Sequence, residues 1–431
     1  MESPKPRVLV IAEACNPEWV SVPLVGWSHY NALREVADVH LVSQVRNRGA
    51  LQRAGLREGH DADFTAIDTE RLLSPLSKLA FKIAGEGKGW TIIQAFYAVA
   101  YPYFERLLWR EFGKDLKAGR FDVVHQITPL SPTSPPLMAK WCSKIGVPFV
   151  WGPLNGGAPW PKEFRDAQRK EREWLASVRG GMKLVPGYKS ARRTASAIIC
   201  GSQITLGQMP DFCKNRCIYL PENGIDPARF TAERTRTATD GPLRLVSIGR
   251  LVPYKGFDMA IEAAMPLLRD GRATLDIYGS GPMLDDLKRQ TADVNAVRFP
   301  GWVKHEQVPA LLAENDLLVF PSIREFGGGV ALEAMAVGLP VACVDYAGPP
   351  ELVTPDVGWL VPLGNRETII RGFREVLEAI AADPSQLETK GEAAKARVRD
   401  LFTWPAKARQ TRQIYDAVRT SSPLPDFGMP L

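Results

Sequence analysis

The sequence predicts an α/β protein built from two doubly wound domains, each with a parallel sheet covered by helices. Short, largely β-branched apolar runs alternate with longer helical stretches, which is typical of parallel sheets covered by helices. This alternation occurs in both halves of the chain. A chain of 431 residues is also too long for one hydrophobic core and suits two domains of about 200 residues each.

Buried strands are predicted in the first half where short apolar runs occur. The predicted strands are Val8–Ile11, Val39–Val42, Val123–Val124, Pro148–Trp151 and Ala197–Cys200. Helices are predicted near residues 26–37, 138–145 and 162–177. Because Val8–Ile11 follows the first residues directly, we interpret it as a strand and not as the core of a secretory signal.

The second half repeats the alternation without repeating a sequence motif. Its predicted strands are Leu243–Ile248, Leu275–Tyr278, Leu317–Phe320 and Val341–Val344. Its predicted helices lie near residues 258–268, 282–290, 307–314 and 330–337. The polar, turn-prone stretch Pro227–Gly241 is interpreted as the interdomain linker, and a terminal helix is expected from Trp404 onward.

The composition is typical of a soluble globular protein, with 45% hydrophobic and 24% charged residues. A net charge of +6 suits phosphate-bearing ligands or an anionic membrane surface, but the positive residues are too dispersed to predict nucleic-acid binding. No membrane span is expected, because no run of about 18 uncharged apolar residues occurs. Cys213 and Cys217 have poor zinc spacing, so the six cysteines are expected to be structural or unpaired thiols in a cytoplasmic protein.

Residues 84–112 form an aromatic-rich segment that is too short to span a bilayer. One interpretation is a helical hairpin packed on the first domain. The other is an amphipathic contact with a lipid-like acceptor or with the inner face of a membrane, where the protein would be peripheral.

The segment from Glu325 to Gly338 carries the strongest functional pattern. A strand predicted to end at Phe320 is followed by a glutamate, by glycines and by a short helix. Glycines at such a junction let a ligand approach the backbone, and the N–H groups of a helix N-terminus attract an anion. Glu333, early in the helix, is placed to accept both hydroxyls of a ribose. The simpler alternative is a surface helix with an ordinary N-terminal acid.

Two cations are predicted at the same edge of the second sheet. Arg250 and Lys255 follow the strand Leu243–Ile248, and doubly wound folds bind ligands at the carboxyl edge of their strands. Preorganised cations there stabilise the charge that a diphosphate gains as it leaves a sugar. The alternative is a pair of solvated loop residues.

Other nucleotide chemistry is disfavoured. Gly279–Gly281 supplies two glycines after a strand but lacks the third glycine of a dinucleotide fingerprint, and the chain has no P-loop lysine followed by Ser or Thr. An NAD-dependent enzyme, a kinase and an ATPase are therefore not expected. Val303, after a predicted strand end, either borders a nucleotide base or only packs.

Together these segments resemble the family 4 retaining glycosyltransferases, whose GT-B fold consists of two facing Rossmann-like domains with parallel sheets and an interdomain cleft. The resemblance covers nearly the whole chain and is strongest from about residue 222 to residue 365. The family's E-x7-E motif is matched by Glu325 and Glu333, and its basic pair by Arg250 and Lys255. Further matches are Pro221–Asp226, Gly348–Val353 and Gly358–Pro362.

The resemblance implies roles for these residues. Glu325 would contact the donor sugar as a catalytic residue, and Glu333 would bind the ribose. Arg250 and Lys255 would hold the diphosphate. The residues implied near the sugar and phosphates are Gly328, Gly329 and Val330.

The chain departs from the family pattern in three places. The usual Pro-Phe-Gly after the first glutamate reads Phe326-Gly327-Gly328, which predicts a more flexible loop. The N-terminal glycine-rich loop is reduced to Pro23–Trp27, which leaves Gly26 as a candidate acceptor or sugar contact. His125 matches a frequent active-site histidine, but Ile127 replaces the second histidine of an H-x-H pattern. His125 is therefore either catalytic or buried.

The loop after the strand Pro148–Trp151 is a second candidate for acceptor or sugar contact, through Asn155, Gly156 and Gly157. Basic residues interleaved with glutamates follow it, and we interpret them first as a solvated, ion-paired face. A binding patch for an anionic lipid head is the second interpretation. These basic residues are Arg165, Arg169, Lys170 and Arg172.

The implied organisation is an acceptor-binding domain over residues 1–222, a nucleotide-sugar-binding domain over 223–404, and a C-terminal helix and tail over 405–431. The implied enzyme moves a sugar, with retention, from a UDP- or GDP-linked donor to a glycan or lipid-linked acceptor in cell-surface polysaccharide or glycolipid synthesis. No metal or cofactor is expected if Arg250 and Lys255 carry the charge. The alternatives are a sugar-nucleotide 2-epimerase and a non-catalytic sugar-nucleotide or glycan-binding partner.

Overall fold

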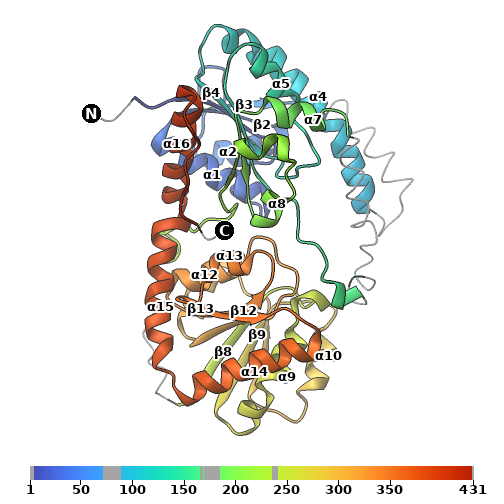
Figure 1. Ribbon diagram of the computed structural model, residues 1–431, viewed down its shortest axis with the longest axis vertical. Coiled ribbons are helices and arrows are strands. Elements are labelled where there is room, and N and C mark those ends of the chain that lie inside the picture. The colour runs from blue at the N-terminus through green and yellow to red at the C-terminus, as the bar shows by residue number, and fades with distance from the viewer. Residues whose placement is uncertain (1–3, 71–88, 166–167, 169–184, 235–240, 430–431) are drawn as a thin grey trace.

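The computed structural model describes residues 4–70, 89–165, 168, 185–234 and 241–429. It contains two all-parallel sheets, with strand orders β3-β2-β1-β4-β5-β6-β7 and β10-β9-β8-β11-β12-β13, one above the other along the long axis of the molecule (Figure 1). Counted within its own domain, the second sheet has the 3-2-1-4-5-6 order of a Rossmann fold, and the first has the same order with a seventh strand, β7, added next to β6. Ligands of such folds bind outside the carboxyl ends of the strands. The predicted pair of Rossmann-like domains is confirmed.

The first domain contains the seven-stranded sheet. Its strands are β1 (Arg7–Ala12), β2 (Asp38–Gln44), β3 (Phe64–Ile67), β4 (Val123–Thr128), β5 (Phe149–Leu154), β6 (Ala197–Cys200) and β7 (Cys217–Tyr219). Its helices are α1 (Val22–Val36), α2 (Arg48–Arg53), α4 (Gly89–Lys117), α5 (Leu137–Lys144), α7 (Tyr188–Thr194) and α8 (Gln203–Gly207).

The second domain contains the six-stranded sheet. Its strands are β8 (Leu243–Ile248), β9 (Ala273–Tyr278), β10 (Val297–Gly301), β11 (Leu317–Phe320), β12 (Val341–Asp345) and β13 (Gly358–Pro362). Its helices are α9 (Phe257–Arg269), α10 (Leu284–Gln290), α11 (Val308–Ala313), α12 (Gly329–Ala336), α13 (Pro349–Leu352), α14 (Arg366–Ala382) and α15 (Ser385–Arg397).

All nine strands predicted from the sequence are present. The four others, β3, β7, β10 and β13, are the edges of the two sheets, and of these only the end of β10, before Val303, was predicted. An edge strand has one sheet neighbour and needs less apolar cover than a central strand. β10, for example, has no fully buried residue. Of the helix predicted over 162–177, only residues 162–165 and 168 are described, and they include a single 3-10 turn, η2 (Lys162–Phe164).

The last helix, α16 (Trp404–Thr420), returns the chain to the first domain, where it lies against α1 (Figure 1). The Thr403 hydroxyl caps its start by accepting a hydrogen bond from the backbone N–H of Ala406. Beside this return, Ile225 N–H donates to the Phe402 carbonyl at 2.8 Å. The passage after β7 and the return into α16 therefore run side by side between the domains.

Helix α4 contains the described part of the aromatic segment. From Tyr101 onward its buried side chains pack into the core of the first domain, among them Phe104, Leu108 and Phe112. This agrees with the interpretation that the segment packs on that domain. Residues 84–88 and the side chains of 89–100 lie outside the described residues. Within the described part of the chain, no helix is both long and apolar enough to cross a membrane.

Candidate functional site at the domain junction

Glycine opens helix α12 at the carboxyl edge of the second sheet. Gly328 precedes the helix with a φ of 52°, in the left-handed region that glycine adopts at little cost. At Gly327 a Cβ atom would lie 2.2 Å from Asn223 Nδ2 and 3.0 Å from Glu222 Oε1. Glycine is thus favoured at 328 by its backbone conformation and at 327 by its close neighbours, and the start of α12 lies against Glu222 and Asn223.

Lys255 and Glu325, predicted for the diphosphate and the sugar, meet in an ion pair. Lys255 lies in the turn η5 (Pro253–Lys255) after β8, and its ammonium is 5.5 Å from the centre of the Phe320 ring at the end of β11. The Ser322 hydroxyl donates to the Glu325 carboxylate at 3.4 Å. Arg250, also after β8, is exposed. The structure thus brings both predicted cations and Glu325 to one sheet edge.

Glu333 lies in the second turn of α12 and accepts a hydrogen bond from a histidine that the sequence did not single out. His305 Nε2 is 2.7 Å from Glu333 Oε1, and Arg229 donates to His305 Nδ1 at 2.8 Å. Because arginine only donates, Nδ1 must be the acceptor and Nε2 must carry the proton. Val303 is half-buried against the core, while the adjacent Trp302 is 72% exposed.

His125 is buried in the first domain, unlike a residue that lines the junction. It is fully buried in β4, where Nε2 donates to the Gly152 carbonyl at 2.8 Å and Nδ1 accepts from the Tyr415 hydroxyl at 2.6 Å. Burial lowers the pKa of this imidazole to about 4, so the ring is neutral at physiological pH. This geometry matches the buried alternative.

Gly26 lies in helix α1 and not in a loop, which corrects the expectation for Pro23–Trp27. Pro23 sits in the first turn of α1, a position that proline favours because its φ is already helical and the missing N–H has no partner there. A Cβ at Gly26 would lie 2.2 Å from the Ala14 carbonyl oxygen. The glycine thus allows close packing of α1 on the loop after β1.

Asn155 reaches a buried carboxylate that the sequence did not single out either. Its side-chain nitrogen donates to both oxygens of Glu222, at 3.1 and 3.0 Å. Burial raises the pKa of the Glu222 carboxyl to about 7, against the opposing effects of Asn155 and Lys407. Gly156 N–H donates to the Thr205 hydroxyl at 2.9 Å, and Gly157 N–H donates to Asn155 Oδ1 at 2.9 Å.

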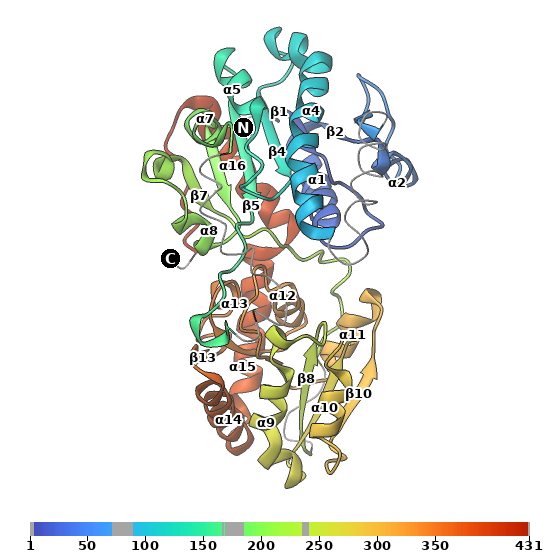
Figure 2. The same ribbon diagram turned by 90° about the vertical axis from the view of Figure 1, so that its right-hand side faces the viewer.

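Residues 158–164, which we call the crossing segment, run from the first domain onto the second (Figures 1 and 2). Arg324 Nε donates to the Ala158 carbonyl at 3.0 Å, and the Tyr346 hydroxyl donates to the Pro159 carbonyl at 3.1 Å. The Arg324 guanidinium also lies 4.9 Å from the centre of the Trp160 ring. The segment is therefore bound directly beside Glu325.

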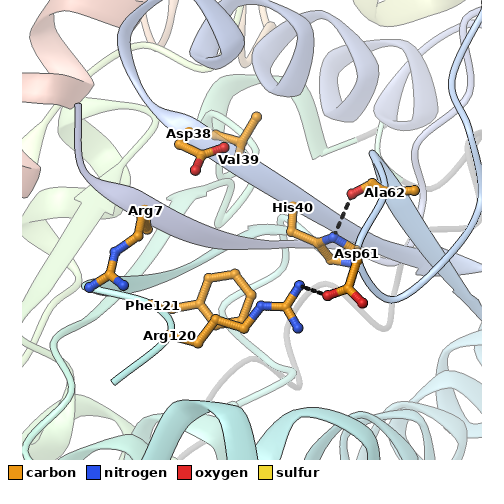
Figure 3. Close-up of a pocket in the computed structure, with 8 residues that line it drawn as sticks. All are labelled: Arg7, Asp38, Val39, His40, Asp61, Ala62, Arg120 and Phe121. Carbon is orange, nitrogen blue, oxygen red and sulfur yellow. Dashed lines mark hydrogen bonds and ion pairs between the residues drawn. The ribbon is translucent and has the colours of Figure 1, made fainter. Parts of the chain in front are cut away.

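A separate pocket of about 270 Å³ lies at the opposite, amino edge of the first sheet, near the starts of β1, β2 and β4 (Figure 3). Both arginines that line it are paired, with Arg120 2.8 Å from Asp61 and Arg7 2.6 Å from Asp122. The pocket is therefore unsuited to a diphosphate. Among the described residues, no group of three or more His, Cys, Asp or Glu side chains could hold a metal ion.

Comparison with known proteins shows to which family the chain belongs. The profile of the family described as Glycosyl transferases group 1 matches residues 230–395, which include Arg250, Lys255, Glu325 and Glu333. The chain is 34% identical over 221 residues to a glycogen synthase of Mycobacterium tuberculosis, covering 50% of this chain. It spans about half the length of that relative, 52%.

A second relative is the GDP-mannose-dependent monoacylated alpha-(1-6)-phosphatidylinositol monomannoside mannosyltransferase of Corynebacterium glutamicum. The two are 30% identical over 309 residues, 64% of this chain and 77% of the relative. The crystal structure of Anabaena Alr3699/HepE in complex with UDP and glucose superposes with a TM-score of 0.56 at 17% identity, covering 96% of this chain and 100% of the other. With two facing Rossmann-like domains and this extent of similarity, the chain has the GT-B fold and belongs to the glycosyl transferases group 1 family.

Proposed function

We propose that this protein transfers a sugar, with retention of its anomeric configuration, from a nucleotide-diphosphate sugar to a glycan or lipid-linked acceptor. The observation that carries the proposal is the meeting of Lys255 and Glu325 beside the glycine-opened N-terminus of α12. An anion, a sugar and a ribose can be held there side by side, because Glu333 lies one helical turn further on.

In this proposal the diphosphate binds between the N–H groups of α12 and the cations Lys255 and Arg250. Lys255 then turns from Glu325 to the phosphate, which frees the carboxylate for a sugar hydroxyl. Glu333 exchanges its hydrogen bond from His305 for the ribose hydroxyls. As the bond between the sugar and the phosphate breaks, the two cations stabilise the charge that develops on the leaving diphosphate. The proposal includes no metal and no cofactor.

Retention follows if the acceptor hydroxyl attacks from the face that the diphosphate leaves. The acceptor oxygen forms the new bond to the anomeric carbon, the bond to the phosphate oxygen breaks, and the leaving phosphate accepts the acceptor's proton. In this proposal the Glu325 carboxylate binds a sugar hydroxyl, so it is not assigned as a covalent nucleophile. A same-face displacement is therefore favoured over a two-carboxylate scheme.

We place the reaction in cell-surface polysaccharide or glycolipid synthesis at the cytoplasmic face of the membrane. The name of one relative supports a glycolipid product, since that protein is a mannosyltransferase of a monoacylated phosphatidylinositol monomannoside. The identity of the base, UDP or GDP, and a membrane contact through residues 84–112 stay predictions.

The test is thermal unfolding with a panel of UDP-, GDP- and ADP-sugars. One nucleotide sugar should raise the Tm of the wild type by mass action. Glu333→Ala should lose most of this shift, whereas Glu378→Ala, which removes an exposed helical glutamate on α14, should keep it. A wild type that no nucleotide sugar stabilises would overturn the proposal. Turnover of a bound nucleotide sugar without any acceptor would favour the epimerase, and binding without turnover the non-catalytic partner.

A further inference from the structure

Glu222 is a buried acid at the point where the chain leaves the first domain. It follows β7 by three residues and is only 8% exposed. One carboxylate oxygen lies 3.0 Å from the position that a Cβ at Gly327 would occupy. Asn223, the next residue, donates to the Gly327 carbonyl at 3.0 Å. Glu222 is thus held against the loop between Glu325 and α12.

The surroundings of Glu222 include charges from two other parts of the chain. Lys407 from α16 lies close enough to favour the charged form of the carboxyl, and Glu325 opposes it. Lys407 is itself buried and donates to the Pro221 carbonyl. Among the described residues, the hydrogen bonds that Glu222 accepts all come from Asn155. A carboxylate has about four acceptor sites, so the two contacts from Asn155 leave acceptor capacity unused.

Keeping a carboxylate buried here is costly. A buried charge costs several kcal/mol even when it is paired, and Asn155 and Lys407 offset only part of this cost, since the pKa of the Glu222 carboxyl stays raised. Buried acids with shifted pKa values concentrate at functional sites. The position of Glu222 beside the proposed donor site supports a role in binding.

The glycine at position 327 gives this carboxylate room. The family pattern Glu-Pro-Phe-Gly reads Glu325-Phe326-Gly327-Gly328 here, so glycine stands where the pattern has phenylalanine. No side chain at 327 separates Glu222 from the loop that opens α12. A Cβ at position 327 would meet the Asn223 amide and the Glu222 carboxylate, so both linker side chains pack directly against this loop.

We propose that Glu222 is a sugar-binding residue, whose carboxylate accepts a hydrogen bond from a hydroxyl of the sugar held against Gly327–Gly329. The inference rests on the proposed function, because it places the donor sugar at this loop. Glu222 would be a second acid at the sugar site, after Glu325, and it comes from the linker between the domains. Asn155 of the first domain donates hydrogen bonds to it, and the charge of Lys407 on α16 favours its ionised form.

The experiment separates the sugar from the nucleotide. The Tm of each variant is measured as a function of concentration with UDP or GDP alone, and with the matching nucleotide sugar that stabilises the wild type. Glu222→Gln should bind the nucleoside diphosphate as the wild type does, within about 2-fold. It should lose about 10-fold or more of the additional affinity that the sugar gives, which corresponds to one hydrogen bond to a charged acceptor.

Glu105→Gln is the matched control. Glu105 is also fully buried and has a raised pKa, but it accepts hydrogen bonds from the N–H groups of Leu137 and Met138 at the start of α5. Its loss should leave the affinity for the sugar unchanged. If Glu222→Gln does not fold, Glu222→Asp is measured instead, since it keeps the charge but withdraws it from Gly327 by one methylene.

The outcomes distinguish this inference from the proposed function. If no nucleotide sugar stabilises the wild type, the proposed function fails, and the inference fails with it. If the wild type responds to a nucleotide sugar and the Glu222 variants respond equally, the proposed function stands and Glu222 is only structural. If Glu222→Gln binds the nucleoside diphosphate alone as poorly as it binds the nucleotide sugar, the lost contact is not one with the sugar, and the inference is contradicted.

Discussion

The Lys255 ammonium and the Glu325 carboxylate neutralise each other between the ends of β8 and β11, and both side chains are largely buried. In the proposed reaction this pair opens when the diphosphate arrives, so each member gains a ligand as it loses a partner. After the exchange Lys255 is paired with the phosphate and the Glu325 carboxylate accepts a hydrogen bond from the sugar, so neither charge is left buried without a partner.

Lys255→Ala removes the cation nearest the leaving phosphate. We expect kcat/KM to fall by about 100-fold to 1000-fold, as is typical when one preorganised group that stabilises transition-state charge is removed. Steady-state assays of nucleoside diphosphate release check this, with Lys288→Ala on the exposed face of α10 as the control. Equal activity of the two variants would show that Lys255 does not act on the diphosphate.

Tyr415→Phe tests whether His125 is structural. The substitution leaves His125 Nδ1 buried without its donor, which should lower the free energy of unfolding by about 1–3 kcal/mol. The kcat should not change, because the His125 ring is fully buried in the first domain. Denaturant unfolding and steady-state kinetics measure both effects, and Tyr103→Phe on α4 serves as the control. A large fall in kcat without a fall in stability would restore the catalytic alternative for His125.

The raised pKa of Glu105 predicts that the stability of the folded protein depends on pH. Burial raises the pKa of its carboxyl to about 8 in the folded protein, above the usual value near 4.5. Between these values the folded state holds a proton that the unfolded state releases, so stability falls as the pH rises toward 8. Relative to Glu105→Gln, the wild type should therefore lose Tm between pH 5.5 and pH 8.5 (roughly the window set by linkage). Parallel Tm curves for the two proteins would contradict this prediction.

Among the elements, the crossing segment ties the first domain to the loop that carries Glu325. Trp160 lies between the Arg324 guanidinium and Tyr254, whose ring is 6.1 Å away at 90°. Phe164 also packs against the core of the second domain. Since Arg324 is adjacent to Glu325 in the chain, this contact fixes the backbone from which the proposed catalytic carboxylate projects.

Trp160→Ala should loosen that contact. We expect a loss of about 1–3 kcal/mol in the free energy of unfolding, from reduced apolar burial and the lost cation–π contact. Limited proteolysis should cut within residues 156–165 faster than in the wild type. Trp302→Ala, which removes a 72% exposed side chain, is the control for both measurements. Unchanged cleavage within this range would show that Trp160 does not hold the segment.

The central strands were predictable because each buries a run of apolar residues, whereas the edge strands β3, β7, β10 and β13 carry weaker patterns. Glu325, Glu333, Arg250 and Lys255 were predictable because glycines and strand ends mark their positions locally. His305 and Glu222 were not, since their partners lie 28 and 67 residues away along the chain. Only the folded structure shows which distant side chains a carboxylate meets.

At the scale of the whole molecule, the two sheets are joined by side-by-side passages of the chain, the linker after β7 and the return into α16. Glu222 and Lys407 lie on these two passages, while the crossing segment joins the domains elsewhere through Arg324 and Tyr346. The proposed donor site is thus built mainly on the second domain. The first domain and the linker, however, contribute Asn155 and Glu222 beside it.

A crystal structure with the nucleotide sugar that stabilises the protein most tests the proposed site directly. We predict that the diphosphate will lie at the N-terminus of α12 beside Lys255 and Arg250. The ribose should bind Glu333 in place of His305, and the sugar should lie between Glu325 and Gly327. A nucleotide bound elsewhere, for example in the pocket at the amino edge of the first sheet, with the Lys255–Glu325 and His305–Glu333 contacts intact, would contradict the site and the function proposed from it.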